Sequence, residues 1–339
     1  MRRWPAWLLG FTDILEAVNA AARTTYRLGL RRSERAAVPV ISVGNIACGG
    51  TGKTPLVAAL ARTLLAAGAR PAILTRGYRR RASQPVLIWK ERQVGWEQAG
   101  DEPTLLARAL PDVPIVVDPD RVRGAATAVR ETDATHLLLD DGFQHWRLAR
   151  DLDIVTVEAA DPFCANAPRR EHPNALARAH AVVLSRAVDR TEALAAMAVL
   201  GPYAPNATFV ATKLAARGLH RGGERQPAEA LRGVTVLALA GIASPQSFIH
   251  TLGDLGAHIV DMHFYSDHHR YSRRELQSIL AEAEPNGILV VTTAKDIVKL
   301  PPDLATSVAW LEVEAVPLFG SFEDLLGPVL GSPKVESQA

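Results

Sequence analysis

A glycine-rich hexapeptide between a short apolar run and a helical pattern most constrains what this chain can fold into. Gly49-Gly50-Thr51-Gly52-Lys53-Thr54 follows the β-branched run at 38–43 and precedes a helical pattern that begins near Lys53 and stops at Gly68. Strand, glycine loop and helix in this order are typical of a phosphate-binding loop, because backbone N–H groups curl around phosphate oxygens and the helix N-terminus favours an anion. The sequence therefore predicts a P-loop NTPase-like α/β fold that binds a nucleoside triphosphate.

Two residues of this loop have defined roles in phosphate chemistry. We expect Lys53 to contact the β- and γ-phosphates and the Thr54 hydroxyl to ligate Mg²⁺. Alanine stands at position 47, where the pattern G-x4-G-K-[ST] has its first glycine. The alternative is a turn that caps a helix and leaves the lysine solvated, but lysine occurs only six times in the chain, which favours a functional role. The predicted triphosphate site comprises Ala47, Cys48, Gly49, Gly50, Thr51, Gly52, Lys53 and Thr54.

The composition restricts the class of protein further. Of the 339 residues, 48% are apolar and 22% are charged, and the formal net charge is +2. These fractions exclude a disordered, collagen-like or coiled-coil chain, and the near-balanced charge disfavours a nucleic-acid partner. Cys48 and Cys164 are the two cysteines, with no further ligands at zinc spacing. We therefore expect a reducing compartment, without a disulfide framework or a structural zinc site.

Strand and helix patterns alternate along the chain and predict two α/β lobes. Strand patterns occur first at 38–43, 72–74, 115–117, 136–139, 154–157 and 181–184, and later at 234–240, 259–264 and 288–292. Helical patterns between the strands are typical of a parallel sheet. Alternating residues around glycines at 208–221 indicate a hairpin or ribbon. We predict a P-loop domain at 31–205, a β-ribbon linker at 206–231 and a second, smaller α/β lobe at 232–330.

The first thirty residues form an amphipathic helical pattern. Apolar residues recur at helical spacing with arginines around them, at Trp4, Trp7, Leu8, Phe11, Leu15 and Val18, and at Arg2, Arg3, Arg23, Arg27, Arg31 and Arg32. No stretch reaches the ~20 apolar residues of a transmembrane helix. Asp13 and Glu16 interrupt the apolar run and argue against a secretory signal. Two interpretations of 1–30 stay open, a helix packed on its own domain and a helix lying in a membrane interface.

An apolar strand ends in two carboxylates in the segment THLLLDDGFQH at 135–145. In a P-loop fold an acidic residue at such a strand tip holds Mg²⁺, directly or through water. Spacing does not distinguish Asp140 from Asp141, so either is a candidate ligand that the other orients. The alternative is an Asp-Gly turn that needs no metal.

Three further clusters lie after predicted strands or at a helix entrance. TRGYRRR at 75–81 follows a strand, and its arginines suit an anionic substrate, although a solvated basic loop would have the same composition. Asp101 precedes Glu102 at a helix entrance and is either a functional acid or an N-cap. Another predicted strand is followed by Ser266-Asp267-His268-His269. The two histidines are either functional or simply hydrogen-bonded within the loop, and no further metal ligands lie at suggestive spacing.

Together these motifs resemble one family, the tetraacyldisaccharide 4'-kinases of lipid A biosynthesis. The resemblance covers most of the chain in order, through VGN at 43–45, GGTGKTP at 49–55, TRGYRR at 75–80, GDEP at 100–103, LLLDDGFQH at 137–145, FYSDHHRYS at 264–272 and TTAKD at 292–296. The alanine at 47 fits this family. TRGY, GDEP and DDGFQH in combination are much more specific than the P-loop by itself.

The resemblance implies an enzyme, a phosphotransferase that uses ATP and Mg²⁺. Its acceptor would be the 4'-hydroxyl of a tetraacylated, lipid-linked glucosamine disaccharide 1-phosphate. It would act as a peripheral protein at the cytoplasmic face of the inner membrane, docked through the amphipathic helix. Neither a nucleic acid nor an obligate protein partner is implied.

The resemblance also assigns roles to residues. Asp101 would be the base on the sugar hydroxyl, with His268 as its partner and Lys53 on the phosphates. The implied metal ligands are Thr54, Asp140, Asp141 and Glu171, and the implied substrate contacts are Arg76 and Tyr78. The chain departs from the family at 165–168, where Ala-Asn-Ala-Pro replaces Leu-Pro-Ala-Gly, so the match at Glu171 is weaker.

Two other classes of protein share the loop. Partitioning and metal-insertion ATPases have the deviant loop Lys-Gly-Gly-x-Gly-Lys-Thr, but Cys48 takes the place of its first lysine. A nucleotide-dependent switch at a membrane surface would transfer nothing. Both would hydrolyse ATP without a lipid acceptor, whereas the kinase requires the acceptor and yields a product one phosphate heavier.

Overall fold

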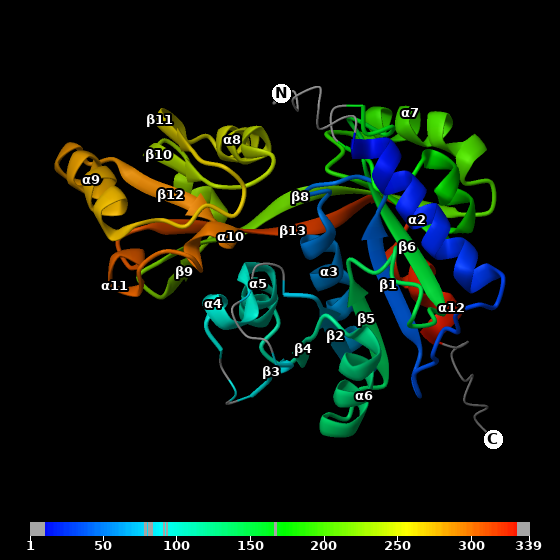
Figure 1. Cartoon of the computed structure of the whole chain (residues 1–339). Coiled ribbons are helices and arrows are strands. Elements are labelled where there is room, and N and C mark those ends of the chain that lie inside the picture. Colours follow the sequence, from blue (N-terminus) through cyan, green and yellow to red (C-terminus); the bar gives the residue numbers. More distant parts are fainter. Residues whose placement is uncertain are drawn as a thin grey trace, which may run out of the picture.

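One continuous sheet connects the two lobes of the molecule (Figure 1). The computed structural model describes residues 11–77, 80, 84–90, 92, 94–165 and 168–330, and within them the sheet has thirteen strands. Their order is β11-β10-β12-β13-β8-β7-β6-β1-β5-β2-β4-β3, with β9 paired to β8. Neighbours are parallel except at β13–β8, β8–β9 and β3–β4. The predicted α/β class with a mostly parallel sheet is confirmed.

The strands of the first lobe are apolar runs buried between helices. They are β1 (Val40–Asn45), β2 (Pro71–Thr75), β3 (Val86–Ile88), β4 (Ile115–Val117), β5 (His136–Asp140), β6 (Leu152–Glu158) and β7 (Ala181–Ser185). β1, β2 and β7 are buried along their whole length, as expected of a parallel sheet covered on both faces. The strand predictions for this lobe are confirmed to within two residues at each end.

Helices cover both faces of this part of the sheet. They are α2 (Phe11–Arg27), α3 (Lys53–Ala66), α4 (Trp96–Ala99), α5 (Asp101–Ala109), α6 (Arg121–Glu131), α7 (Arg190–Leu200) and α12 (Phe322–Leu330), with 3-10 turns η1 (Pro173–Arg178) and η2 (Gly201–Tyr203). On one face Leu56 and Leu60 of α3 share a core cluster with Leu325 and Leu326 of α12. The C-terminal helix therefore completes the core of the first lobe.

A two-stranded ribbon joins the lobes. It pairs β8 (Thr208–Arg221) antiparallel with β13 (Ala309–Phe319), and β9 (Glu224–Gln226) extends β8 as a short hairpin. The predicted linker at 206–231 contains only the first strand of this ribbon. Its partner and α12 lie inside the range predicted for the second lobe, 232–330, because the chain crosses back to the first lobe at its end. A pattern within 206–231 cannot reveal a partner strand so distant in sequence.

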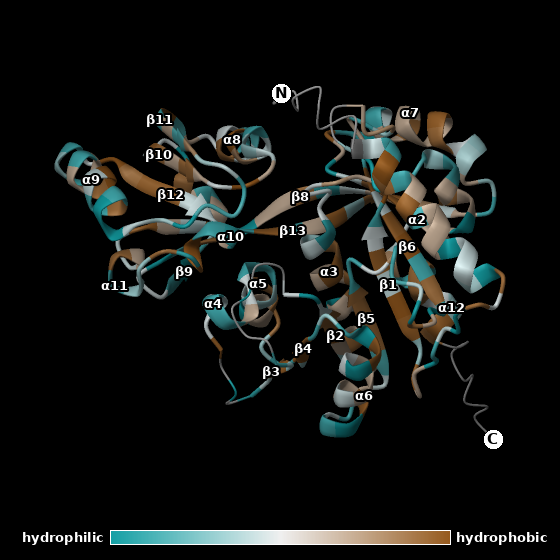
Figure 2. Ribbon diagram, viewed as in Figure 1, coloured by the Kyte–Doolittle hydropathy of each residue, from teal (hydrophilic) through white to brown (hydrophobic). Residues whose placement is uncertain are grey.

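The second lobe repeats the strand–helix order on a smaller scale. It contains β10 (Thr235–Ala240), β11 (His258–Phe264) and β12 (Leu289–Thr293), with α8 (Pro245–Asp254), α9 (Arg273–Ala283), α10 (Ala294–Ile297), α11 (Pro302–Ala305), η3 (Ala228–Leu231) and η4 (Glu284–Asn286). The predicted strands at 234–240, 259–264 and 288–292 are confirmed. Apolar clusters lie on both faces of these strands, and Figure 2 shows their hydrophobic residues in brown.

Helix α2 packs on its own lobe and exposes apolar residues on another face. Asn19 Nδ2 donates to the Arg170 carbonyl at 2.9 Å, and Arg169 pairs with Glu16 at 3.0 Å. Ile14 and Val18 are 57% and 60% exposed. None of the helices within the described residues is long and apolar enough to cross a membrane. Trp4, Trp7 and Leu8 lie outside the described residues, and the membrane-interface role of this helix stays a prediction.

Candidate active site

The phosphate loop connects β1 to α3 and is held in shape by its neighbours. Gly49 and Gly52 have φ values of 118° and 75°, a region that favours glycine because it has no Cβ. Thr51 anchors the loop, since its hydroxyl lies 2.8 Å from that of Thr156 and its carbonyl accepts a 2.8 Å hydrogen bond from Ser185. The loop is thus pre-shaped by the ends of the adjacent strands.

Lys53 is the first residue of α3, and its side chain extends toward the residue that follows β5. Its Nζ lies 3.3 Å from Asp141 Oδ1, and Arg170 Nη1 contacts the same carboxylate at 2.8 Å. Burial alone would raise the pKa of Asp141, but the charges of Lys53 and Arg170 outweigh it and hold that pKa far below its usual value. Asp141 is therefore an ionised partner for two cations.

Asp140 has different surroundings although it is the adjacent residue. It is 3% exposed, and its side chain accepts a hydrogen bond from the Thr75 hydroxyl at 3.1 Å. Burial, together with the nearby carboxylates of Glu102 and Asp141, raises the pKa of Asp140 to about 7. A buried carboxylate crowded by other carboxylates is suited to a divalent cation, which would stabilise its charge. Geometry thus separates two residues that spacing could not.

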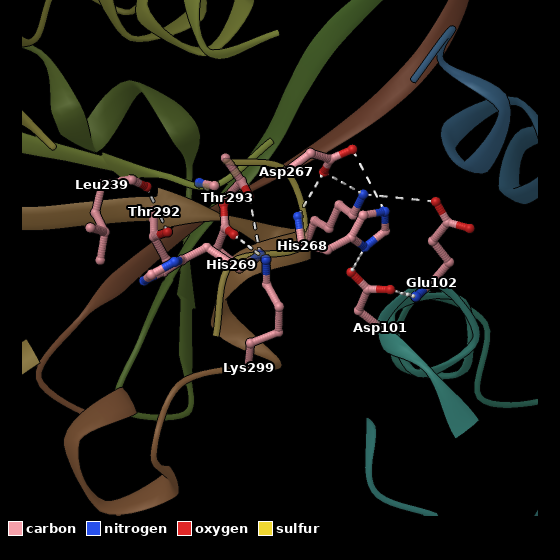
Figure 3. Close-up of polar contacts among 12 residues, drawn as sticks. Asp101, Glu102, Leu239, Asp267, His268, His269, Thr292, Thr293 and Lys299 are labelled. Carbon is pink, nitrogen blue, oxygen red and sulfur yellow. Dashed lines mark hydrogen bonds and ion pairs between the residues drawn. The ribbon is translucent and has the colours of Figure 1, made fainter. Parts of the chain in front are cut away.

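The two lobes meet at an acid–imidazole pair (Figure 3). Asp101 is the first residue of α5, and His268 lies in the loop after β11; Asp101 Oδ2 and His268 Nδ1 are 2.7 Å apart. Gly100, not Asp101, occupies the N-cap position of α5. Burial alone would raise the pKa of Asp101, but its hydrogen bond with His268 and the charge of Lys295 hold that pKa below its usual value. Asp101 is an ionised, buried carboxylate at neutral pH.

Comparison with known proteins identifies the family to which this chain belongs. The model of the tetraacyldisaccharide-1-P 4'-kinase family matches residues 4–329. The chain belongs to this family.

Relatives and a solved structure agree with this membership. The kinase is 45% identical over 313 residues to the tetraacyldisaccharide 4'-kinase of Anaeromyxobacter sp. (strain Fw109-5), and the match covers 87% of this chain and 82% of the relative. It is 38% identical over 331 residues to that of Syntrophus aciditrophicus (strain SB), covering 91% and 88%. Its fold is similar to a crystal structure of LpxK from Aquifex aeolicus in complex with ATP, with a TM-score of 0.73, 28% identity, and coverage of 96% and 97%. The deviant-loop ATPase and the switch are thereby disfavoured.

Among the predicted metal ligands of the kinase, Glu171 lies farther along a polar network. It is 4% exposed and accepts hydrogen bonds from Gln144 at 2.9 Å and Arg178 at 2.5 Å. Arg170 contacts both Asp141 and Gln144, so it links Glu171 to the aspartate pair indirectly. Among the described residues no three His, Cys, Asp or Glu side chains form a metal cage. Mg²⁺ usually takes one or two carboxylates together with substrate phosphates, which fits Asp140 beside the phosphate loop.

The predicted substrate contacts are placed only in part. Arg76 is exposed directly after β2, on the same sheet edge as Asp140, and Tyr78 lies outside the described residues. Gly77 between them has a φ of 68°, and a Cβ there would come 2.4 Å from the Val117 side chain, so the tight exit from β2 requires glycine.

His269 and Lys295 show what spacing leaves unresolved. His269 contacts Glu275 of its own lobe at 3.1 Å and stacks on Tyr265, whereas its neighbour His268 contacts Asp101 of the other lobe. Lys295 was not predicted as a site residue, yet its Nζ lies 3.0 Å from Asp267 and 3.8 Å from Glu102 of the other lobe. The scarcity of lysine and the TTAKD motif are the sequence signals that could have identified it.

Proposed function

We propose that the Asp101 carboxylate accepts the proton of the acceptor hydroxyl while Lys53 holds the phosphates of ATP. The chain is an ATP-dependent kinase of lipid A biosynthesis that transfers the γ-phosphoryl group to the 4'-hydroxyl of a tetraacyldisaccharide 1-phosphate. The observation that carries the proposed roles is the 2.7 Å contact between Asp101 and His268 across the lobes.

Asp101 has the charge and the surroundings of a general base. Its carboxylate is ionised at neutral pH and 6% exposed, so little water competes for the proton that it would take up. Such a base contributes about 10²–10⁴ in rate. His268 holds the carboxylate through Nδ1, and its Nε2 lies 3.6 Å from Asp267. We assign His268 the role of orienting Asp101 and stabilising the transferred proton.

The phosphate side of the site is assigned to the loop and the strand ends around it. Residues 47–54 would surround the phosphates of ATP, and Lys53 would exchange its contact with Asp141 for the β- and γ-phosphates. When bound, Mg²⁺ neutralises charge on the transferring group. Thr54, Asp140 and Asp141 would hold it, with Glu171 supporting them through Gln144 and Arg170.

The finer statements on place and partner also belong to the proposal. The lipid-linked disaccharide would be reached from the cytoplasmic face of the inner membrane by a peripheral enzyme, with Arg76 and Tyr78 on the acceptor. The exposed Ile14 and Val18 of α2 support an interfacial helix within 1–30. We assign no nucleic-acid partner and no obligate protein partner. The domains at 31–205 and 232–330 and the linker at 206–231 stay proposals, with the ribbon strand β13 and the return of α12 to the first lobe noted above.

One experiment tests the roles of these residues together with the reaction. The pure chain is incubated with ATP, Mg²⁺ and disaccharide 1-phosphate lipid in detergent, and the lipid mass is followed over time. We expect a product one phosphate heavier from the wild type and at least 100-fold less of it from Asp101→Asn. Phosphate release that is independent of the acceptor would favour the ATPase instead.

A further inference from the structure

Arg186 stands beside the phosphate loop in an unusual backbone conformation. It follows directly after β7 and has a φ of 55°, the left-handed region that non-glycine residues seldom adopt. A Cβ atom built on Gly50 would lie 3.8 Å from Arg186 Nη2, and one built on Gly52 would lie 3.9 Å from its Nε. The guanidinium therefore lies close to the loop at Gly50 and Gly52.

The guanidinium is held in place but not fully satisfied. Nη1 contacts Glu158 Oε1 at 3.4 Å, and the side chain is only 17% exposed. Nε is buried and has no hydrogen-bond partner. Strained backbone and an unsatisfied buried donor are features that cluster at ligand sites. Neither the sequence motifs nor the proposed mechanism assigns a role to Arg186.

The direction of the nucleotide follows from the sheet order. The strands β7, β6, β1 and β5 are consecutive neighbours, so Arg186 and the aspartate pair lie on opposite sides of the loop after β1. The γ-phosphate must face Asp140, Asp141 and the proposed base Asp101. The nucleoside end of ATP must then extend toward β6 and β7, where Arg186 lies.

We propose that Arg186 forms one wall of the base site and stacks its planar guanidinium on the adenine ring of ATP. The inference rests on the proposed binding of ATP at the loop. A guanidinium is suited to this role because it is planar, permanently charged and weakly hydrated, so it packs against an aromatic face more readily than an ammonium group does. The ion pair with Glu158 restrains the position of the guanidinium before the nucleotide arrives.

The test compares ATP with ribose 5'-triphosphate, which lacks only the base, by calorimetric titration. Arg186→Asn tolerates the left-handed backbone and should weaken ATP binding about 5- to 30-fold. Binding of ribose 5'-triphosphate should change less than about twofold, since its phosphate and sugar contacts remain. Arg190→Asn, an exchange of an exposed arginine nearby on α7, should leave both affinities unchanged.

The other outcomes overturn the inference. Equal weakening of both ligands would assign Arg186 to the phosphates, the ribose or the support of the loop. If Arg186→Asn unfolds, ATP binding is measured with Arg186→Lys instead. Wild-type ATP affinity in Arg186→Lys would show that a positive charge suffices without a planar group and would contradict the stacking role. Wild-type chain that binds no ATP would contradict the proposed function, whereas unchanged ATP affinity in the Arg186 variants contradicts this inference alone.

Discussion

Replacing Asp101 by asparagine tests the proposed base with the least disturbance of the structure. The amide has nearly the same shape, and its oxygen can still accept the hydrogen bond from His268, which is 2.7 Å away. What it loses is the negative charge and the ability to take up a proton. We expect kcat to fall about 10²–10⁴-fold, equivalent to about 3–5 kcal/mol in the barrier.

ATP binding should respond much less than kcat. The predicted phosphate contact Lys53 is paired with Asp141 and not with Asp101, so the triphosphate site keeps its nearest charges. We expect the Kd for ATP, measured by calorimetry, to change less than about threefold. A large loss of ATP affinity with unchanged kcat would refute the role of Asp101 as a base.

A double-mutant cycle with His268 separates a coupled pair from two independent residues. His268→Asn should lower kcat less than Asp101→Asn does, and the double variant should lose much less than the product of the two. His269→Asn is the matched control, because His269 contacts Glu275 and lies away from Asp101. Fully multiplicative losses in kcat would show that the two residues act separately.

Three further predictions concern the phosphates, the metal and the membrane. Lys53→Ala should lower kcat about 10³-fold and should also lower the melting temperature, because Asp141 keeps only Arg170 of its two cationic partners; retention of a tenth of the wild-type kcat would contradict the contact with the phosphates. Asp140→Asn should raise the melting temperature in Mg²⁺-free buffer at pH 8. The pKa of Asp140 is about 7 in the folded state and 3.8 in the unfolded state, so the wild type loses stability as the pH rises from 4 to 7. The stability that Asp140→Asn gains over the wild type should therefore shrink as the pH is lowered from 7 to 4. Asp141→Asn should instead lower the melting temperature, because Lys53 and Arg170 lose their partner. Ile14→Ser with Val18→Ser should leave the melting temperature unchanged, since both side chains are exposed, and should reduce sedimentation with anionic liposomes; a variant that still pellets like the wild type would refute the interfacial role of α2.

The parts of the fold that sequence could predict are those in which neighbours along the chain determine the structure. The loop at 49–54 and the helix after it follow from glycine positions and apolar periodicity, and both are found as expected. The pairing of β8 with β13 was not predictable, because a strand pattern does not name its partner. Likewise, the difference between Asp140 and Asp141 arises from Thr75, Lys53 and Arg170, which come from other elements.

The interlobe contact shows why the proposed site depends on this long-range pairing. Asp101 and Glu102 carry negative charge on α5 of the first lobe, and Lys295 with His268 faces them from the second lobe. Water screens the attraction between Asp101 and His268 less than that of an exposed pair, because their side chains are 7% and 18% exposed. If Asp101 takes up the proton of the acceptor, its charge disappears while Lys295 keeps its own. The electrostatic attraction between the lobes would then be greater before phosphoryl transfer than after it, because Lys295 and His268 would face one negative charge fewer on α5.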